Sequence, residues 1–137
     1  MRIPVGFTLL ATAMLCAGNA QSHHSYAMYD KREVKLQGTV KEFQWTNPHI
    51  FLQVLVPDAS GQMVEWAIEG DGPGQLARKG WKFNTFKPGD KVTLGIAPLR
   101  DGSHAGGLIF IQKEGGERLA GGPLASLDAD RKPAEAK

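Results

Sequence analysis

Apolar and polar residues alternate strictly at the start of the folded part of the sequence. Val34, Leu36 and Val40 occupy even positions, and the odd positions between them are polar or charged. This period of two is typical of a strand with one buried face. The alternation then shifts, because the next large apolar residue, Phe43, has an odd number. A shift of one residue exchanges the two faces of a strand, so we expect a β-bulge or sharp bend at residues 41–42.

Four more segments have the composition and the length of strands. They cover residues 50–57, 62–70, 91–99 and 108–114. Turn-forming residues separate the first two of these segments, so we expect those two to form a hairpin. Between the second and the third segment, Pro73 suits the first turn of a short helix and Gly80 suits its end.

The order of these elements is three strands, a short helix and two further strands. This is the order of the OB-fold, a five-stranded Greek-key barrel. We therefore expect an all-β protein with a small OB-like barrel over residues 23–120 and one short helix between the third and fourth strands. Residues 121–137 contain few apolar side chains, which favours a disordered C-terminal tail.

Residues 1–22 are typical of a secretory signal peptide. Arg2 is followed by an apolar run, and small residues precede two candidate cleavage points, after Ala20 and after Ser22. The run is too short to span a bilayer comfortably, since that takes roughly 20 apolar residues. We therefore expect a periplasmic protein with no membrane association after cleavage. Cys16 would leave with the leader, so no disulfide is expected.

Charge and motif content exclude several classes of function. The whole chain has 16 basic and 14 acidic residues, and the leader removes one of the basic ones. So balanced a chain lacks the basic stripe of a nucleic-acid binder, so we expect no nucleic-acid partner. The sequence contains no nucleophile elbow, phosphate-binding loop or catalytic cysteine motif, and we therefore expect no enzyme.

The four histidines carry the candidate chemistry, and all stand outside predicted strand interiors. His23 and His24 lie at the expected mature N-terminus, His49 follows the first strand, and His104 lies between the last two strands. In OB-folds the two loops that hold His49 and His104 flank the ligand-binding face, so we expect these two near one rim. Trp45, Asn47 and His104 are the predicted ligand rim.

Copper(II) is the cofactor that the N-terminal histidines suggest. After cleavage at Ser22, the amine and imidazole of His23 could chelate one ion, with a further imidazole from His24 or His49. After cleavage at Ala20, His23 is the third residue, and an amine, two backbone amides and its imidazole give a square nitrogen plane. The alternative is that the histidines are solvated, with His49 Nδ1 bonded to backbone in a turn.

The chain resembles a family of short exported bacterial proteins known only as a domain of unknown function. The pieces that carry the resemblance are "HHSYAMYD", "GTVKEFQWTNPHIFLQV", "VEWAIEG", "LARKGWKFNTFKPGDKVTL" and "RDGSHAGGLIFI", in this order. The resemblance implies a periplasmic location and a small β-barrel, and it implies no activity.

Three classes of function follow from these features. The first is a periplasmic binding or accessory protein for a small ligand that the sequence does not name. The second is a copper(II)-binding protein that uses His23, His24 and His49. The third is an interaction module that docks on another periplasmic protein through an exposed sheet edge or the rim at His49.

Overall fold

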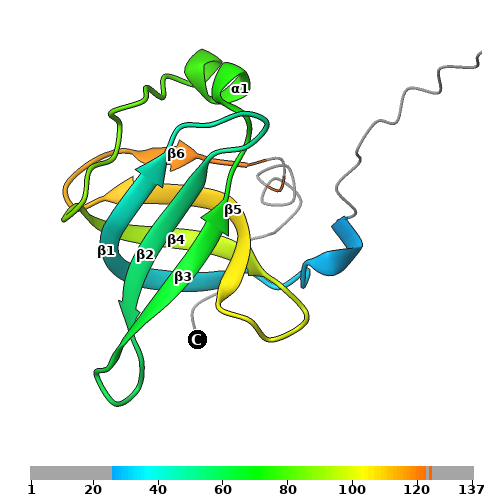
Figure 1. The fold of residues 1–137 in the computed structure, drawn as a ribbon, viewed down its shortest axis with the longest axis vertical. Coiled ribbons are helices and arrows are strands. Elements are labelled where there is room, and N and C mark those ends of the chain that lie inside the picture. The colour runs from blue at the N-terminus through cyan, green and yellow to red at the C-terminus, as the bar shows by residue number, and fades with distance from the viewer. Residues whose placement is uncertain (1–25, 123, 125–137) are drawn as a thin grey trace, which may run out of the picture.

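The computed structural model of the chain describes residues 26–122 and residue 124. The predicted elements are present, and two short ones are added. In chain order they are the 3-10 helix η1 (Tyr26–Met28), β1 (Val34–Gln44), β2 (Phe51–Pro57), β3 (Met63–Glu69), α1 (Pro73–Arg78), β4 (Lys91–Pro98), β5 (Ala105–Lys113) and β6 (Arg118–Ala120) (Figure 1). Within these residues, no helix has the length and apolar character needed to cross a membrane.

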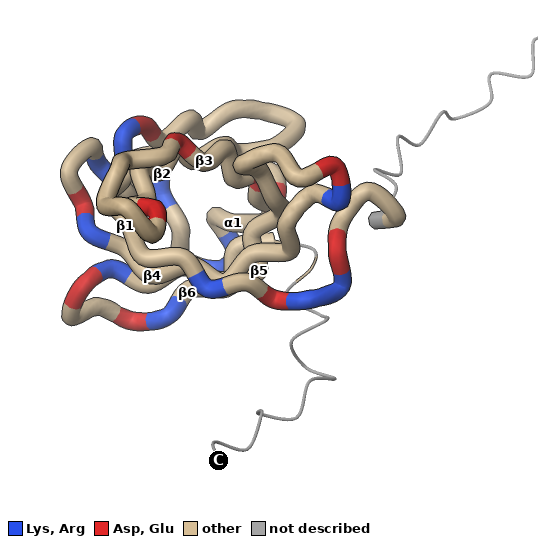
Figure 2. The backbone as a smooth tube through the Cα atoms, turned by 90° about the horizontal axis from the view of Figure 1, so that it is seen from below, with Lys and Arg blue, Asp and Glu red and all other residues tan. Residues whose placement is uncertain are grey.

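Strand pairing closes five of the strands into a barrel. The sheet has the order β3-β2-β1-β4-β5-β6, and β3 also pairs with β5 in parallel, which joins the two sides of the sheet. Viewed from below, the strands form a ring, and α1 lies across its far end (Figure 2). This connectivity, with a short helix between β3 and β4, confirms the predicted OB-like fold.

The shift of alternation in β1 corresponds to a bulge. The register of β1 against β2 shifts between Val40 and Glu42, so Lys41 has no partner in the ladder. The extra residue brings Phe43 to the same side of the strand as Val40. Val40 is buried and Phe43 packs against the same core cluster, which confirms the predicted bulge at residues 41–42.

The barrel interior is filled by the inward-facing side chains of all five strands, together with residues from α1 and the segment that follows it. Its buried members are Leu36, Val40, Ile50, Leu52, Val54, Ile68, Leu76, Trp81, Phe86, Val92, Leu94, Ile96, Leu108 and Ile111. Leu76 of α1 is completely buried, so the helix closes one end of the barrel with its apolar side. Because the interior is packed with side chains, ligand sites must lie on the outer faces or at the rims.

A second, smaller core lies outside the barrel. Tyr29 and Leu124 pack there with Ala97, Ile109 and Phe110. Strand β6 pairs with β5 just before it, and Leu124 is only 3% exposed. Leu124, which follows the predicted boundary at residue 120, therefore packs in this second core. The rest of the predicted tail, residues 125–137, lies outside the described residues.

Candidate functional site

Three segments that are far apart in the sequence meet beside the end of β3. The Tyr29 hydroxyl donates a hydrogen bond to Glu69 Oε2 at 3.2 Å. The other carboxylate oxygen, Glu69 Oε1, lies 3.4 Å from His49 Nδ1. His49 Nδ1 also lies 3.1 Å from the carbonyl oxygen of Gly70. We call Tyr29, His49, Glu69 and Gly70 the His49–Glu69 site.

The loop that carries His49 is fixed to the end of β3 by backbone hydrogen bonds. Gly70 N donates to Ile50 O at 3.0 Å, and Ile50 N donates to Asp71 O at 3.2 Å. On the other side of the histidine, the Thr46 hydroxyl donates to His49 O at 3.0 Å. These hydrogen bonds fix the backbone around His49 to the end of β3, and they thereby hold the imidazole beside Glu69.

The segment that carries Tyr29 is fixed equally well. Tyr29 forms an isolated β-bridge with Leu99, and Asp30 N donates to Pro98 O at 2.8 Å. The Arg100 side chain donates from Nε to Tyr29 O at 3.0 Å. The chain that leads in from the N-terminus is thus bound to the end of β4, with the buried Tyr29 phenol against Glu69.

The contacts of His49 decide which of its ring nitrogens carries the proton. A carbonyl oxygen only accepts hydrogen bonds, so the contact with Gly70 O requires a proton on Nδ1. In the neutral imidazole the lone pair is then on Nε2, which is the arrangement found in metal-binding histidines. The His49 side chain is 24% exposed, so it lies at the surface of the barrel.

A partly buried ion pair between Asp71 and Lys79 follows the site in the chain and is structural. The Asp71 carboxylate is only 8% exposed and accepts a hydrogen bond from Lys79 Nζ at 2.9 Å. The Asp71 amide donates to Gly121 O at 3.0 Å, which ties the C-terminal segment to the same corner. Its charge is already compensated, so Asp71 fixes α1 and the tail against the barrel.

Shifted pKa values occur at carboxyl groups in exposed turns. Hydrogen bonds from the Ser60 and Ser103 hydroxyls hold the pKa values of Asp58 and Asp101 below the usual range. The pKa of Asp90 is lowered in the same direction by the Lys113 ammonium group. These carboxylates cap turns or pair on the surface, and they do not assemble into an acid–base pair.

The predicted site residues do not all come together. His23 and His24 lie outside the described residues. His104 packs on the Trp66 ring, with centroids 5.1 Å apart, whereas His49 contacts Glu69. Positions 66 and 69 of one strand point to opposite faces, so the two histidines contact different sides of β3. In the described part of the chain, no three His, Cys, Asp or Glu side chains are grouped so as to hold a metal ion.

The remaining rim residues have separate places. Trp45 is half-buried and packs edge-on against Phe43, with centroids 5.9 Å apart, so it belongs mainly to the core. Asn47 is exposed in the loop before His49. Neither side chain contacts His104 through any ring pair or hydrogen bond among the described residues.

Sequence reasoning missed Tyr29 and Glu69 as members of the site. Glu65 and Glu69 share the outer face of β3, and both had the appearance of solvated carboxylates. Glu65 fits that interpretation, because it pairs with Lys41 at the surface at 2.6 Å. Glu69 differs because it is 22% exposed and contacts two other side chains. The one available signal was that Tyr29 and Glu69 belong to the quoted pieces "HHSYAMYD" and "VEWAIEG".

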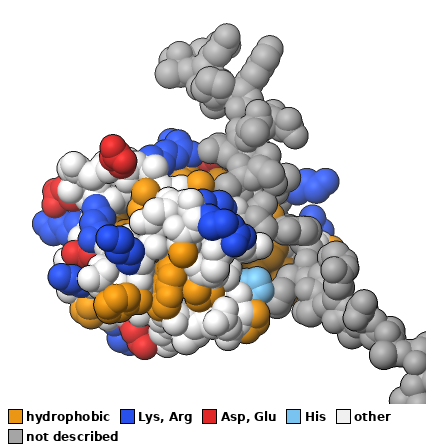
Figure 3. Space-filling model, turned by 90° about the horizontal axis from the view of Figure 1, so that it is seen from above, with side chains coloured by type: hydrophobic (Ala, Val, Ile, Leu, Met, Phe, Trp, Pro, Cys, Tyr) orange, Lys and Arg blue, Asp and Glu red, His pale blue; other side chains and the backbone are white. Residues whose placement is uncertain are grey.

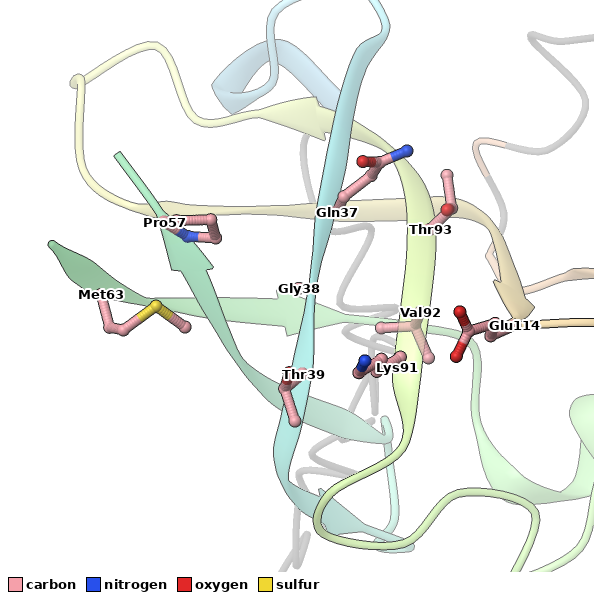
Figure 4. A pocket seen from close by; sticks show the side chains of 9 residues that line it. All are labelled: Gln37, Gly38, Thr39, Pro57, Met63, Lys91, Val92, Thr93 and Glu114. Carbon is pink, nitrogen blue, oxygen red and sulfur yellow. The ribbon is translucent and has the colours of Figure 1, made fainter. Parts of the chain in front are cut away.

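A second concave surface lies on the outer side of β1. It is a groove of about 410 Å³ lined by Gln37, Gly38, Thr39, Pro57, Met63, Lys91, Val92, Thr93 and Glu114 (Figure 4). Five of its lining side chains are polar or charged, and none of these five forms a side-chain hydrogen bond or ion pair with another described residue. We call this surface the β1 groove.

The described residues form a small OB-like β-barrel with one short helix. The chain belongs to DUF6152, a family of unknown function whose sequence profile matches residues 11–109. This confirms the resemblance to an uncharacterised family. Among curated proteins, none matches the chain. Among solved structures, a mitochondrial single-stranded DNA-binding protein from S. cerevisiae is similar, with 14% identity, a TM-score of 0.42, and coverage of 61% of this chain and 93% of that chain.

Proposed function

We propose that this protein is exported to the periplasm and serves there as a small binding protein whose ligand is copper(II). The observation that carries the proposal is the meeting of Tyr29, His49 and Glu69 at one corner of the barrel. It brings the segment just after the N-terminal histidines to the same carboxylate as His49. This supports a shared site, because Tyr29 follows His23 by six positions in the sequence.

The length of the connecting chain supports this arrangement. His23 precedes Tyr29 by six positions. Six residues span at most roughly 20 Å even when fully extended. The chain length therefore allows His23 to lie at most roughly 20 Å from Tyr29. Nitrogen donors from a free amine and imidazoles suit copper(II), which accepts tetragonal nitrogen sets.

The distribution of charge fits the expectation that the partner is not a nucleic acid. Basic and acidic residues alternate around the barrel with no stripe of one sign (Figure 2). Nucleic-acid binding draws most of its affinity from clustered lysine and arginine on phosphates. A metal ion or another periplasmic protein agrees better with so mixed a surface.

Export is the first testable element of the proposal. Protein recovered from the periplasmic fraction is expected to begin at residue 21 or at residue 23, because small residues precede both cleavage points. N-terminal sequencing of that fraction makes the measurement. Replacing Leu10 with arginine interrupts the apolar run and should leave the precursor uncleaved in the cytoplasm. A periplasmic protein that begins at Met1 would contradict the proposal.

A second candidate function is a docking module for another periplasmic protein, and an open edge of the sheet favours it. Residues Val34 to Gly38 of β1 pair with β4 but not with β2. Val40 N donates to Asp90 O on the β4 side. Successive backbone amides of a strand point to alternate sides. The amides of even-numbered residues therefore face β4, and those of Lys35 and Gln37 face the open side. This edge borders the β1 groove.

Beside this edge β1 and β2 are not paired, and the two strands differ in their capacity to bind an added strand. Pro57 at the end of β2 has no amide to donate, which blunts that side. Phe83, in the segment after α1, is 73% exposed. The view from above shows hydrophobic side chains gathered among basic ones (Figure 3). As a docking surface, the edge of β1 is better defined than the surface at Phe83, because its backbone groups offer directional hydrogen bonds.

Amide hydrogen exchange tests whether this edge is open. The amides of Lys35 and Gln37 are expected to exchange at least about 100-fold faster than those of Leu36 and Gly38, since only the latter face β4. Residue-resolved exchange by NMR on the metal-free protein makes the comparison. Equal protection at all four amides would show that the edge is covered and would remove this candidate.

A further inference from the structure

We infer that the segment after α1 binds the surface of an anionic phospholipid membrane. Phe83 enters the headgroup layer, and the basic side chains around it contact the lipid phosphates. This binding goes beyond the proposed function and is independent of it, because it uses neither the histidines nor a metal ion. It also differs from the expectation of no membrane association after cleavage, which rested on the lack of a spanning segment and not on the surface of the folded domain.

A fixed turn holds Phe83 out in the solvent. At 73%, Phe83 is the most exposed large hydrophobic side chain in the described part of the chain. Two nearby aromatic residues, Trp81 and Phe86, are buried in the barrel core instead. Between them, Lys82 N donates to Thr85 Oγ1 at 2.6 Å and Thr85 N donates to Lys82 O at 2.9 Å. The turn is therefore anchored on both sides, and Phe83 stands at its tip.

The packing below the turn leaves no place for a third ring. The centroids of Trp81 and Phe86 lie 5.2 Å apart, and Phe43 of β1 packs on both rings, at 6.3 Å and 5.7 Å. Because a protein core is close-packed, Phe83 cannot turn inward without displacing one of these side chains. A partner that removes Phe83 from water gains the transfer of an aromatic side chain, and it has little backbone disorder to overcome.

The segment that carries Phe83 is positively charged, whereas the chain as a whole is nearly balanced. Residues 72–89 contain no aspartate or glutamate and four basic residues, which are Arg78, Lys79, Lys82 and Lys87. All four are exposed. Lys79 pairs with Asp71, but the side chains of the other three form no ion pair with a described residue. We call Arg78, Lys82, Phe83 and Lys87 the Phe83 surface.

The form of the Phe83 surface favours a lipid partner. A membrane surface needs no directional hydrogen bonds, only apolar side chains for the headgroup layer and basic side chains for the anionic lipids. The turn suits this need, because the N–H and C=O groups of Lys82 are both paired within it. Single-stranded nucleic acid is bound instead in a basic groove with several stacking rings, and Trp81 and Phe86 are buried.

Vesicle sedimentation with the processed, metal-free protein tests this binding. One set of vesicles contains equal parts of phosphatidylcholine and phosphatidylglycerol, and the other contains phosphatidylcholine alone. We expect the protein to bind the anionic vesicles at least about 10-fold more tightly, because each basic residue near the surface contributes about 5-fold. Salt at about 1 M should release it. Equal binding to both sets, or binding to neither, would overturn the inference and leave the copper proposal untouched.

Matched variants test the two components of the Phe83 surface. Phe83→Ala is expected to weaken binding to the anionic vesicles by about 10-fold, since the apolar side chain is lost. Met63→Ala is its control, because Met63 is 51% exposed but lines the β1 groove. Lys82→Gln should weaken binding by about 5-fold, whereas Lys35→Gln, at an exposed lysine of β1, should not. If Phe83→Ala binds as tightly as Met63→Ala, Phe83 has no part in the binding and the inference is wrong.

The variant Phe83→Trp reports insertion directly. It should bind as wild type does, and its additional fluorescence should move to shorter wavelength on the anionic vesicles, because indole enters the headgroup layer. Wild-type protein, with its three tryptophans, is the reference. A bound variant with unchanged emission would show adsorption by charge alone and would contradict insertion. Binding to polyglutamate or single-stranded DNA, but not to the anionic vesicles, would assign the Phe83 surface to another class of partner and overturn the inference.

Discussion

Replacement of His23 by alanine is expected to weaken copper(II) binding more than any other histidine substitution, by about 100-fold or more. The reason is that His23 contributes to the metal site under both cleavage points. It supplies amine and imidazole together if the chain begins at residue 23, and it supplies the imidazole of a four-nitrogen plane if the chain begins at residue 21. The affinity is measured by titrating the processed protein with copper(II) and following the d–d absorption.

His104→Ala is the control for this experiment. Its ring packs on Trp66 and not at the His49–Glu69 site, so the variant should bind copper(II) as wild type does. The affinity should also fall as the pH drops below about 6.5, because protons then compete with the metal for imidazole nitrogen. An added N-terminal residue should weaken binding through the amine. If wild type and His23→Ala give the same weak curve, the histidines are solvated side chains and the copper proposal is wrong.

Replacement of Gly38 by alanine is expected to destabilise the barrel by about 2 kcal/mol, as overpacking in a filled core does. A Cβ at this position would overlap the carbonyl oxygen of Leu55 and would lie 2.8 Å from Val54 Cγ1 and 3.0 Å from Val56 Cγ2. Strand β1 passes this close to β2 just where the two strands separate, and only glycine leaves the necessary space. None of these three atoms is the far end of a long flexible side chain, so the overlap cannot be relieved locally.

The consequence is measurable as a fall in the midpoint of thermal unfolding of roughly 10 °C for a domain of this size. Gly74→Ala in α1 is the matched control, because no atom lies within 4 Å of the added carbon. Alanine is also favoured over glycine in a helix, by roughly 0.5–1 kcal/mol, so this variant should unfold no lower than wild type. Equal midpoints for both variants would contradict the close approach of β1 and β2.

The barrel was predictable because its strands carry an unambiguous period of two. The shift of phase between Val40 and Phe43 located the bulge, and Pro73 located the start of α1. Where apolar side chains are scarce, the pattern gives no signal. Strand β5 begins at Ala105 and not at residue 108, since Gly106 and Gly107 hold their places by backbone pairing with β3.

Strand β6 was missed for a related reason. It has three residues, of which only Leu119 is a large apolar side chain, and it exists because the edge of β5 offers a pairing partner. The burial of Leu124 likewise depends on Tyr29, which lies at the other end of the chain. Such contacts join segments from the two ends of the described part of the chain, and a local pattern of residues does not contain that information.

The candidate site was only half predictable. His49 stood out by its residue type and by its place after a turn, and its bond from Nδ1 to a backbone carbonyl was weighed as an alternative to metal binding. In the structure His49 Nδ1 lies 3.1 Å from the carbonyl oxygen of Gly70. The role of Glu69 was not predictable, because its contacts with His49 and with Tyr29, 40 positions away, depend on how the chain folds. His23 and His24 remain predictions.

The central claim is that the processed N-terminus and the His49–Glu69 site bind one copper(II) ion together. Native mass spectrometry of protein purified from the periplasm, with one equivalent of copper(II) added, tests it most directly. The account predicts a chain that begins at residue 21 or 23 and carries a single copper ion, and it predicts that this species disappears in His23→Ala. A correctly processed chain that stays free of copper, or that binds several ions with no preference for one, would contradict it.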